Sequence, residues 1–378
     1  MIRLVIIIIL FLVSLLTVFK AFEYYMWMFA IIATEFSWFF ILLTLIALGS
    51  GYYTNKYQLA GTILGLIALP FFISPIVRAY TVAGSLKQDF TKAFGAGSTI
   101  INGDNNQKSF SFWKMFSGNK TVNYKQLNYV SYADGTTLSM DFYPSQIVGN
   151  RACVIVVHGG AWNKGDNKQL PELNSHLALM GYNVAVINYR LAPRYQNPAP
   201  VEDVNAALAF LKKRAADLHI DAGSFVLLGR SAGAQIALLT AYAGHDKSIK
   251  GVIDYYGPAD MVWGYSIPSS PLIMDSRQVM RDYIGGSYQQ VPEKFAASSP
   301  LEFIDHQSPP TLIIHGDNDV LVSPEHSRRM NEKLAENGVK HFLLKLPWAT
   351  HGFDFNLNGP GGQLATYTVE RFLNTVTR

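Results

Sequence analysis

The sequence has very little cysteine, a small net charge and no basic stripe, and each of these properties excludes a class of protein or partner. Only one cysteine, Cys153, occurs in 378 residues, which excludes an intramolecular disulfide framework. The formal net charge is only +4, and the Lys and Arg residues are scattered among acidic residues instead of forming a basic stripe. Nucleic acid is therefore not an expected partner. No internal repeat is evident, and the length suits one large catalytic domain with an additional segment.

The first quarter of the chain has few charges and contains three long apolar runs. They cover residues 4–19, 24–48 and 59–77. Because about 20 apolar residues span the hydrocarbon core of a bilayer, the second and third runs are long enough to cross and the first is slightly short. We therefore predict a transmembrane segment of about three helices over residues 1–83, in a multi-pass protein of the cell membrane with the lipid bilayer as a partner. Glu35 lies inside the second run, where a charge is costly unless it is paired, faces other helices or is protonated.

Two properties of this segment stay open. Arg3 and the first apolar run also fit a secretory signal peptide, but no small-residue cleavage site follows, so a retained helix is preferred. The basic residues near the ends of the expected spans are too few to determine which side of the membrane the rest of the chain faces.

After the apolar segment the composition changes twice. Residues 84–123 are polar and rich in Gly, Asn, Ser and Lys, and we predict a linker there. From residue 124 onward, short apolar runs alternate with helical patterns. Strands are expected at 138–143, 153–157, 183–188, 225–228, 251–255, 311–315 and 341–346, and helices at 201–216, 232–242, 324–337 and 363–376. This alternation predicts a doubly wound, mostly parallel α/β sheet domain over residues 124–378.

A serine motif lies between one of these strands and the helix after it. Residues 229–233 read Gly-Arg-Ser-Ala-Gly, and this Gly-x-Ser-x-Gly pattern places a serine hydroxyl at a sharp turn from strand to helix. A serine hydroxyl is nearly unreactive without a base and without donors for the oxyanion that forms when it attacks a carbonyl. Ser231 is therefore the predicted nucleophile, and the backbone N–H of Ala232 is a predicted oxyanion donor.

The remaining candidates follow other strands. Residues 158–162 read His-Gly-Gly-Ala-Trp, and we expect the N–H groups of Gly160 and Ala161 to complete the oxyanion hole, although a tight strand-ending turn would also explain the glycines. For the acid and the base, the order Ser, Asp, His favours Asp319 over Asp317, together with His351 in a late loop. The predicted triad is therefore Ser231, Asp319 and His351.

These motifs resemble the hormone-sensitive-lipase-like and feruloyl or acetyl-xylan esterase-like branch of the α/β-hydrolases. The resemblance covers residues from about 124 to the end. The matching segments are His-Gly-Gly-Ala-Trp at 158–162, Tyr-Arg-Leu-Ala-Pro at 189–193, Gly-Arg-Ser-Ala-Gly at 229–233, Asp-Val-Leu-Val at 319–322 and His-Gly-Phe at 351–353. The resemblance implies an α/β-hydrolase fold, a structural acid at Asp203, and carboxylesterase activity on short acyl groups without a metal or organic cofactor.

The chain also departs from that branch. Ala234 and Gln235 stand where many relatives have a glycine and then a small residue or histidine, and residues 261–290 form an insertion that we expect to act as a lid. The substrate is expected to be an ester of a small molecule, a glycan or a lipid. A peptidase or amidase of the same fold, and a catalytically idle binding module held at the membrane, are the alternatives.

Overall fold

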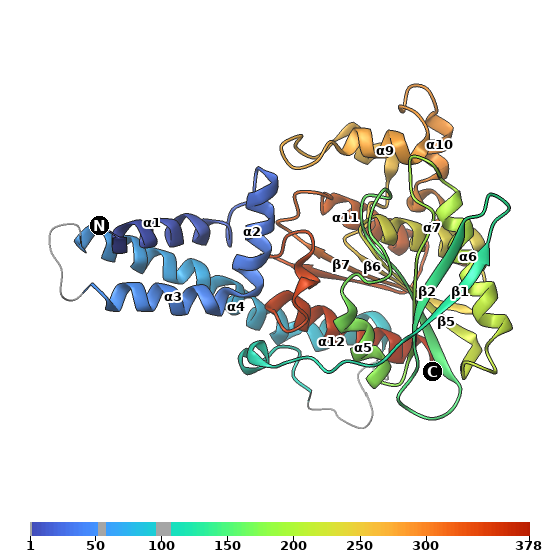
Figure 1. The fold of residues 1–378 in the computed structure, drawn as a ribbon, viewed down its shortest axis with the longest axis horizontal. Coiled ribbons are helices and arrows are strands. Elements are labelled where there is room, and N and C mark those ends of the chain that lie inside the picture. The colour runs from blue at the N-terminus through green and yellow to red at the C-terminus, as the bar shows by residue number, and fades with distance from the viewer. Residues whose placement is uncertain (1, 52–57, 96–106) are drawn as a thin grey trace.

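The computed structural model describes residues 2–51, 58–95 and 107–378. It has two parts, a helical bundle at the N-terminus and an α/β domain built on a single eight-stranded sheet (Figure 1). The bundle projects from one side of the α/β domain, so the molecule is elongated.

The sheet has the strand order β1-β2-β4-β3-β5-β6-β7-β8. Its strands are β1 (Lys125–Ser131), β2 (Thr137–Tyr143), β3 (Arg151–Val157), β4 (Asn183–Ile187), β5 (Ile220–Arg230), β6 (Ile249–Tyr255), β7 (Thr311–Gly316) and β8 (His341–Leu346). Strands β1 and β2 are antiparallel to their neighbours, whereas β3 to β8 are parallel to one another. The carboxyl ends of the parallel strands therefore meet at one edge, where ligands bind in open α/β sheets.

Helices cover both faces of the sheet, as the alternation of its side chains requires. Along β3, Ile155 and Val157 belong to the core on one face, and Val154 and Val156 to the core on the other. Strands buried on both faces read as continuous apolar runs, which is why the sequence pattern located most of them. The helices of this domain are α5 (Pro171–Leu179), α6 (Ala199–Lys213), α7 (Ala232–Gly244), α8 (Met261–Ser266), α9 (Ser276–Ile284), α10 (Pro292–Ala297), α11 (Glu325–Glu336) and α12 (Pro360–Val376), with short 3-10 turns η2 (Phe112–Phe116), η3 (Pro300–Phe303) and η4 (Phe353–Phe355).

The N-terminal bundle differs from the expected three helices. It contains α1 (Ile2–Leu15), α2 (Tyr24–Glu35), α3 (Ser37–Gly49) and the first half of α4 (Gln58–Phe94). Of the described residues, α4 alone forms a single helix long and apolar enough to cross a membrane, and α2 and α3 pass the same test only if they are counted together. Their axes are bent by 86°, so the second apolar run is not one straight helix and three independent spans are not supported.

Glu35 lies directly beside the break between α2 and α3. Its carboxylate accepts the backbone N–H of Gly361, in the first turn of α12, at 2.9 Å and the indole N–H of Trp348 at 3.4 Å. The N–H groups in the first turn of a helix lack partners inside the helix, and a side-chain oxygen of Glu35 supplies one for Gly361. Phe36 leaves the helical conformation next to it, with φ −117° and ψ 30°. The acid within the apolar run thus joins the bundle to the α/β domain.

Helix α4 connects the two parts without an intervening linker. It continues past residue 84, where the linker was expected to begin, and ends at Phe94. Its last turns place Leu86, Phe90 and Phe94 in the same core as α12. The domain boundary predicted at residue 84 therefore falls inside a helix, because apolar residues recur at helical spacing among polar ones. Residues 96–106 of the expected linker lie outside the described residues.

Candidate active site

Ser231 occupies a strained turn between β5 and α7. Its backbone has φ 52° and ψ −121°, a conformation that a non-glycine residue adopts only when its surroundings impose it. Both flanking glycines are needed there. A Cβ on Gly229 would lie 2.3 Å from the carbonyl oxygen of Gly233, and a Cβ on Gly233 would lie 2.3 Å from that of Val157. The turn holds the Ser231 side chain in the pocket described below.

The structure brings the three residues predicted for the triad together. His351 Nε2 lies 2.9 Å from Ser231 Oγ, and His351 Nδ1 lies 2.7 Å from Asp319 Oδ2. Asp319 is buried after β7, and His351 is buried in the loop after β8. Asp317, the other acid considered, is exposed to solvent. The hydroxyl, the imidazole and the carboxylate therefore form one continuous chain of hydrogen bonds.

The Asp319 carboxylate is held by four donors. Its Oδ1 accepts the backbone N–H groups of Leu321 and Val322, both at 2.9 Å, and its Oδ2 faces His351 and, at 3.2 Å, Nε2 of His315. Burial would raise the pKa of Asp319, but the charge of His351 and the hydrogen bonds from both histidines hold it well below its usual range. The carboxylate therefore stays ionised and keeps the His351 ring oriented.

His315 lies beside Asp319. Sequence analysis did not predict a role for this histidine. Burial lowers its pKa, but the hydrogen bond and the charge of Asp319 outweigh burial and raise it overall. Its Nδ1 lies 2.6 Å from Ser327 Oγ. The only signal in the sequence was its place at the end of a buried strand, four residues before the acid.

Arg230, the variable residue of the serine motif, links the loops that carry Ser231 and His351. Its Nε forms a buried ion pair of 2.5 Å with Asp354, three residues after His351. Asp354 also accepts a hydrogen bond from the hydroxyl of Tyr256. Sequence analysis did not identify this pair, because two residues 124 positions apart have no local signal that joins them.

The glycine-rich loop after β3 lies beside Ser231. Gly160 has φ 127°, and a Cβ there would lie 2.0 Å from the carbonyl oxygen of Lys164, so the loop requires glycine. Among the hydrogen bonds of the described residues, none uses the N–H of Gly160 or Ala161. The N–H of Ala232 begins α7, where no partner exists inside the helix. All three residues line the pocket around Ser231.

Residues around this loop stabilise it. The ring of His158 stacks on Tyr189 with centroids 4.3 Å apart, and burial lowers its pKa, which suits a neutral structural histidine. Asp203, the expected structural acid, accepts the backbone N–H and the Nε of Arg190, both at 2.8 Å.

Gln235, one of the departures from related sequences, joins three segments around the site. Its Oε1 accepts the indole N–H of Trp162 at 2.9 Å and the hydroxyl of Tyr283 at 3.0 Å, and its Nε2 donates to the carbonyl of Ser298 at 2.8 Å. The rings of Trp162 and Tyr283 stack with centroids 4.5 Å apart. The glycine-rich loop is therefore tied to the 261–290 insertion through one buried amide.

Ser231 opens into a pocket of about 580 Å³. Its lining comes from the glycine-rich loop, the loops after β7 and β8, and residues 267–280 of the insertion. The insertion thus supplies part of the pocket lining. Three residues of α2 in the N-terminal bundle also line it: Tyr24, Trp27 and Ile31. No pattern in the sequence pointed to this contribution.

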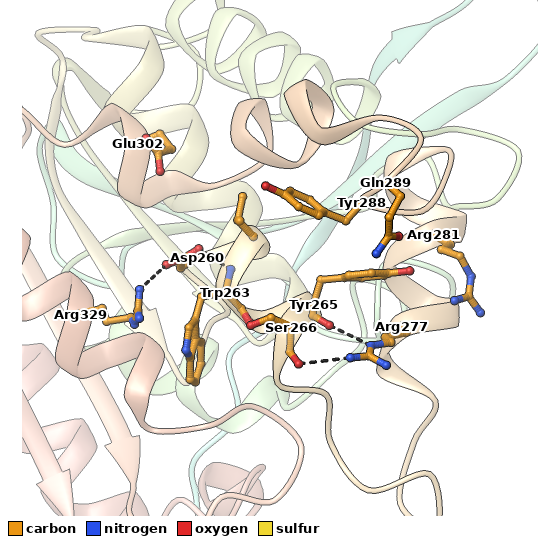
Figure 2. A pocket seen from close by; sticks show the side chains of 11 residues that line it. Asp260, Trp263, Tyr265, Ser266, Arg277, Arg281, Tyr288, Gln289, Glu302 and Arg329 are labelled. Atoms are coloured by element: carbon orange, nitrogen blue, oxygen red, sulfur yellow. Dashed lines mark hydrogen bonds and ion pairs between the residues drawn. The ribbon is translucent and has the colours of Figure 1, made fainter.

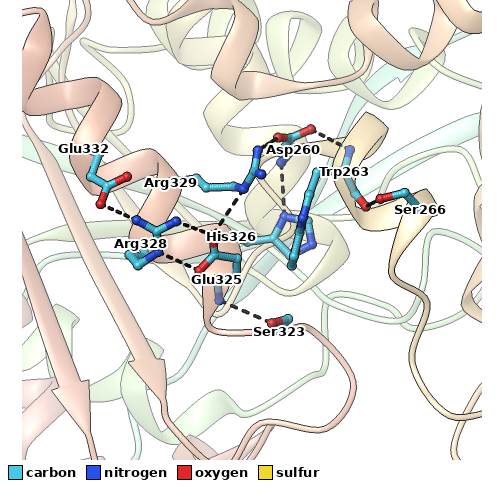
Figure 3. Close-up of polar contacts among 9 residues, drawn as sticks. All are labelled: Asp260, Trp263, Ser266, Ser323, Glu325, His326, Arg328, Arg329 and Glu332. Carbon is cyan, nitrogen blue, oxygen red and sulfur yellow. Dashed lines mark hydrogen bonds and ion pairs between the residues drawn. The ribbon is translucent and has the colours of Figure 1, made fainter.

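One wall of the pocket is built from contacts of α11 with Asp260, the N-cap of α8, and with Trp263 (Figure 3). His326 accepts the backbone N–H of Asp260 at its Nδ1, 3.2 Å away, and packs edge to face against Trp263. Burial is the main reason that the pKa of His326 falls to about 3, so this histidine is neutral. Arg329 of α11 forms an ion pair of 2.9 Å with Asp260, which is a second link between α11 and the N-cap of α8.

A second cavity of about 750 Å³ lies beyond this wall (Figure 2). Three arginines line it, and all three already make structural contacts; Arg281 donates to Gln278 Oε1 at 2.6 Å. Arg277 donates to the carbonyls of Tyr265 and Ser266, and Arg329 is paired with Asp260. The described residues contain no cluster of three or more His, Cys, Asp or Glu side chains placed to hold a metal ion.

Comparison with known families identifies the larger part of the chain. The BD-FAE family model matches residues 140–334, slightly more than half of the sequence. The chain belongs to the BD-FAE family. The matched region includes Ser231 and Asp319 of the triad geometry, whereas His351 and the N-terminal bundle lie outside it.

Curated relatives of this BD-FAE chain are named as esterases. Esterase LipQ of Mycobacterium tuberculosis is 30% identical over 225 residues, which cover 56% of this chain and 52% of that protein. Esterase LipC of the same organism is 30% identical over 240 residues, which cover 60% of this chain and 58% of that protein. The chain thus spans only about half the length of these relatives.

Solved structures agree on the fold. A hyperthermophilic esterase from the archaeon Pyrobaculum calidifontis superimposes with a TM-score of 0.59 at 20% identity, covering 80% of this chain and 97% of that one. A truncated carbohydrate esterase from gut microbiota gives a TM-score of 0.54 at 21% identity, and the match covers 68% of this chain and 100% of that one. The BD-FAE region therefore has the α/β-hydrolase fold.

Proposed function

We propose that this protein is a membrane-anchored serine carboxylesterase. The observation that carries the proposal is the hydrogen-bonded chain from Ser231 through His351 to Asp319, beside three backbone N–H groups for which the described part of the chain supplies no acceptor. The esterase names of the relatives in the BD-FAE family support the same activity.

In the proposed acylation step, Ser231 Oγ attacks the carbonyl carbon of the ester while its proton moves to His351 Nε2. The electron pair of the carbonyl bond moves to the oxygen, which the N–H groups of Gly160, Ala161 and Ala232 stabilise. Each such donor is typically worth about 3 kcal/mol in the transition state. The tetrahedral intermediate then expels the alcohol, whose oxygen takes the proton from His351.

In the proposed deacylation step, water replaces the alcohol. His351 removes a proton from this water, the water oxygen attacks the acyl carbon, and the carboxylic acid leaves as Ser231 recovers its proton. Asp319 keeps the imidazole oriented and stabilises its charged form in both steps. Apart from the ester and this water, these steps use side chains and backbone of this chain.

We propose ester rather than amide bonds, with a short acyl group, as the substrate. The test compares p-nitrophenyl butyrate with butyryl p-nitroanilide, which share the acyl group, on the full-length protein. Release of p-nitrophenol without enzyme-dependent release of p-nitroaniline supports an esterase, whereas release of both products supports the peptidase or amidase alternative. Labelling of Ser231 by a fluorophosphonate probe supports catalysis, whereas an unlabelled folded protein supports the idle binding module.

Attachment to a membrane is supported by the outer surface of the bundle. Large apolar side chains are exposed all around it, although soluble monomers rarely expose contiguous apolar patches larger than a few hundred Å². They are Ile2, Val5, Ile6, Ile8, Ile9 and Leu12 of α1, Phe39, Leu42, Leu45 and Ile46 of α3, and Leu59, Ile63, Leu66, Ile67, Ile73 and Val77 of α4. Helix α4 supplies a segment of membrane-spanning length, and α1 and α3, at about 21 and 20 Å, pack along it.

Full-length protein is therefore expected to stay in the membrane pellet. Alkaline carbonate removes proteins held by surface charge but leaves those whose apolar side chains contact lipid tails, so only detergent should release this protein. Immunoblotting of the pellet and the supernatant measures the outcome. Release by carbonate alone would contradict the proposed anchoring without affecting the proposed chemistry.

A further inference from the structure

Helix α2 contributes one face to the active-site pocket. Tyr24, Trp27 and Ile31 are three and four residues apart, so they share one side of the helix, and all three line the pocket that contains Ser231. The indole N–H of Trp27 donates to the backbone carbonyl of His351 at 2.9 Å. Helix α2 is thus bonded directly to the residue placed beside the nucleophile.

A second contact joins α2 to the insertion. The backbone N–H of Tyr24 donates to the carbonyl of Leu272 at 3.1 Å. The only charged residue of α2, Glu35, is bonded to Gly361 and Trp348 and is absent from the pocket lining. Helix α2 therefore presents an apolar and aromatic wall that is held at both ends.

The position of this wall indicates which part of an ester it contacts. The ring centroids of Trp27 and His351 are 6.4 Å apart, and Ile31 packs beside Gly352, where an added Cβ would lie 3.4 Å from Ile31 Cδ1. In the proposed reaction, His351 Nε2 must reach the oxygen of the leaving alcohol to protonate it. The alcohol part of the ester therefore lies on the histidine side of Ser231, next to α2.

Other parts of the pocket lining are apolar as well. Residues 267–280 of the insertion place Ile273, Met274, Val279 and Met280 in the lining, and Phe355 follows the histidine loop. A volume of about 580 Å³ exceeds what an acetyl or butyryl group requires, so space remains for an extended alcohol.

The rim of the pocket continues the lipid-facing surface of the bundle. Ile267 and Phe355 of the pocket lining are 59% and 55% exposed, and Leu272, whose carbonyl accepts the N–H of Tyr24, is 64% exposed. On the outer face of α2, Tyr25, Phe29 and Ile32 are exposed too. Figure 1 shows α2 lying crosswise where the bundle meets the α/β domain. A bilayer around the bundle would therefore end close to the pocket.

We propose that α2 is the alcohol-binding wall of the active site, and that the substrate is a short-chain ester of an alcohol with an extended hydrocarbon, taken from the bilayer around the bundle. This inference rests on the proposed esterase function. It assigns to the N-terminal bundle a role in substrate selection in addition to attachment.

The test uses the full-length protein in phosphatidylcholine nanodiscs and two esters that share the acetyl group, ethyl acetate and decyl acetate. Acetate release gives kcat/KM for each. Burial of even one methylene can change discrimination by about tenfold, so we expect decyl acetate to exceed ethyl acetate by at least about tenfold. A ratio near one would overturn the inference.

Two serine substitutions at adjacent positions of α2 provide a matched pair. Ile31→Ser changes the pocket face, whereas Ile32→Ser changes the outer face of the same helix. We expect Ile31→Ser to lower the ratio of decyl to ethyl acetate kcat/KM severalfold and Ile32→Ser to leave it as in the parent. Equal effects of both substitutions would also overturn the inference, because they would indicate a general disturbance of α2.

A fluorophosphonate probe separates failure of this inference from failure of the proposed function. Labelled Ser231 together with equal rates on both acetates overturns the role of α2 and leaves the esterase standing. An unlabelled Ser231 with no hydrolysis of either ester overturns both. If Ile31→Ser does not fold, Ile31→Ala removes the same contacts while staying apolar, and it should lower the ratio in the same direction.

Discussion

Replacement of Ser231 by alanine is expected to lower kcat/KM for p-nitrophenyl butyrate by about 10⁴-fold or more. The substitution removes the only oxygen that lies within hydrogen-bond distance of His351 Nε2 in the described residues. Without it no acyl-enzyme can form, and the oxyanion donors can only assist a water molecule. Alanine keeps the Cβ of Ser231, so the strained turn and the fold should persist.

Ser131→Ala is the matched control for this prediction. Ser131 is exposed on the edge strand β1, and its hydroxyl lies 3.0 Å from the hydroxyl of Thr137. We expect it to retain the parental rate, and both variants to unfold at the parental temperature by circular dichroism. If Ser231→Ala were as active as the parent, the proposed mechanism would be wrong.

Replacement of Asp319 by asparagine is expected to lower kcat by about 10⁴-fold, because an amide can donate to His351 Nδ1 and favour the wrong tautomer of the ring. Asparagine occupies nearly the same volume as aspartate. The backbone N–H groups of Leu321 and Val322 can still donate to its side-chain oxygen, so the loop keeps its shape. Initial rates on p-nitrophenyl butyrate measure the loss.

Asp317→Asn, two residues earlier, is the control that decides between the two acids considered from the sequence. Asp317 is exposed and lies outside the pocket lining, so the same substitution should change the rate by less than about twofold. A large loss at residue 317 with little effect at residue 319 would reverse the assignment of the acid.

The sequence predicted most of the sheet because its buried strands are short apolar runs. Strand β1 was not predicted because it contains no such apolar run. It lies at the edge of the sheet, most of its side chains are at least partly exposed, and one buried residue, Tyr129, does not make an apolar run. Helix α5 was missed because it is short and carries only two leucines, Leu173 and Leu177, on its buried side.

The second apolar run illustrates where hydropathy alone misleads. Composition from residue 24 to residue 48 fits one spanning helix, but the chain bends by 86° at Phe36. Beside the bend, Glu35 is hydrogen-bonded to Gly361 and Trp348, more than 300 residues away. Hydropathy averages over neighbours in the sequence, so it cannot include a partner that only folding brings near.

The sequence by itself determined the α/β class of the larger part and the candidates Ser231, Asp319 and His351. Both depend on local patterns: strand-like apolar runs, a serine between two glycines, and the order of acid and base after it. Only the tertiary structure decided that Arg230 pairs with Asp354 and that Trp27 of the bundle contacts the histidine loop. Such contacts join residues 124 and 324 positions apart, and their free energy depends on distance in space, which no local pattern records.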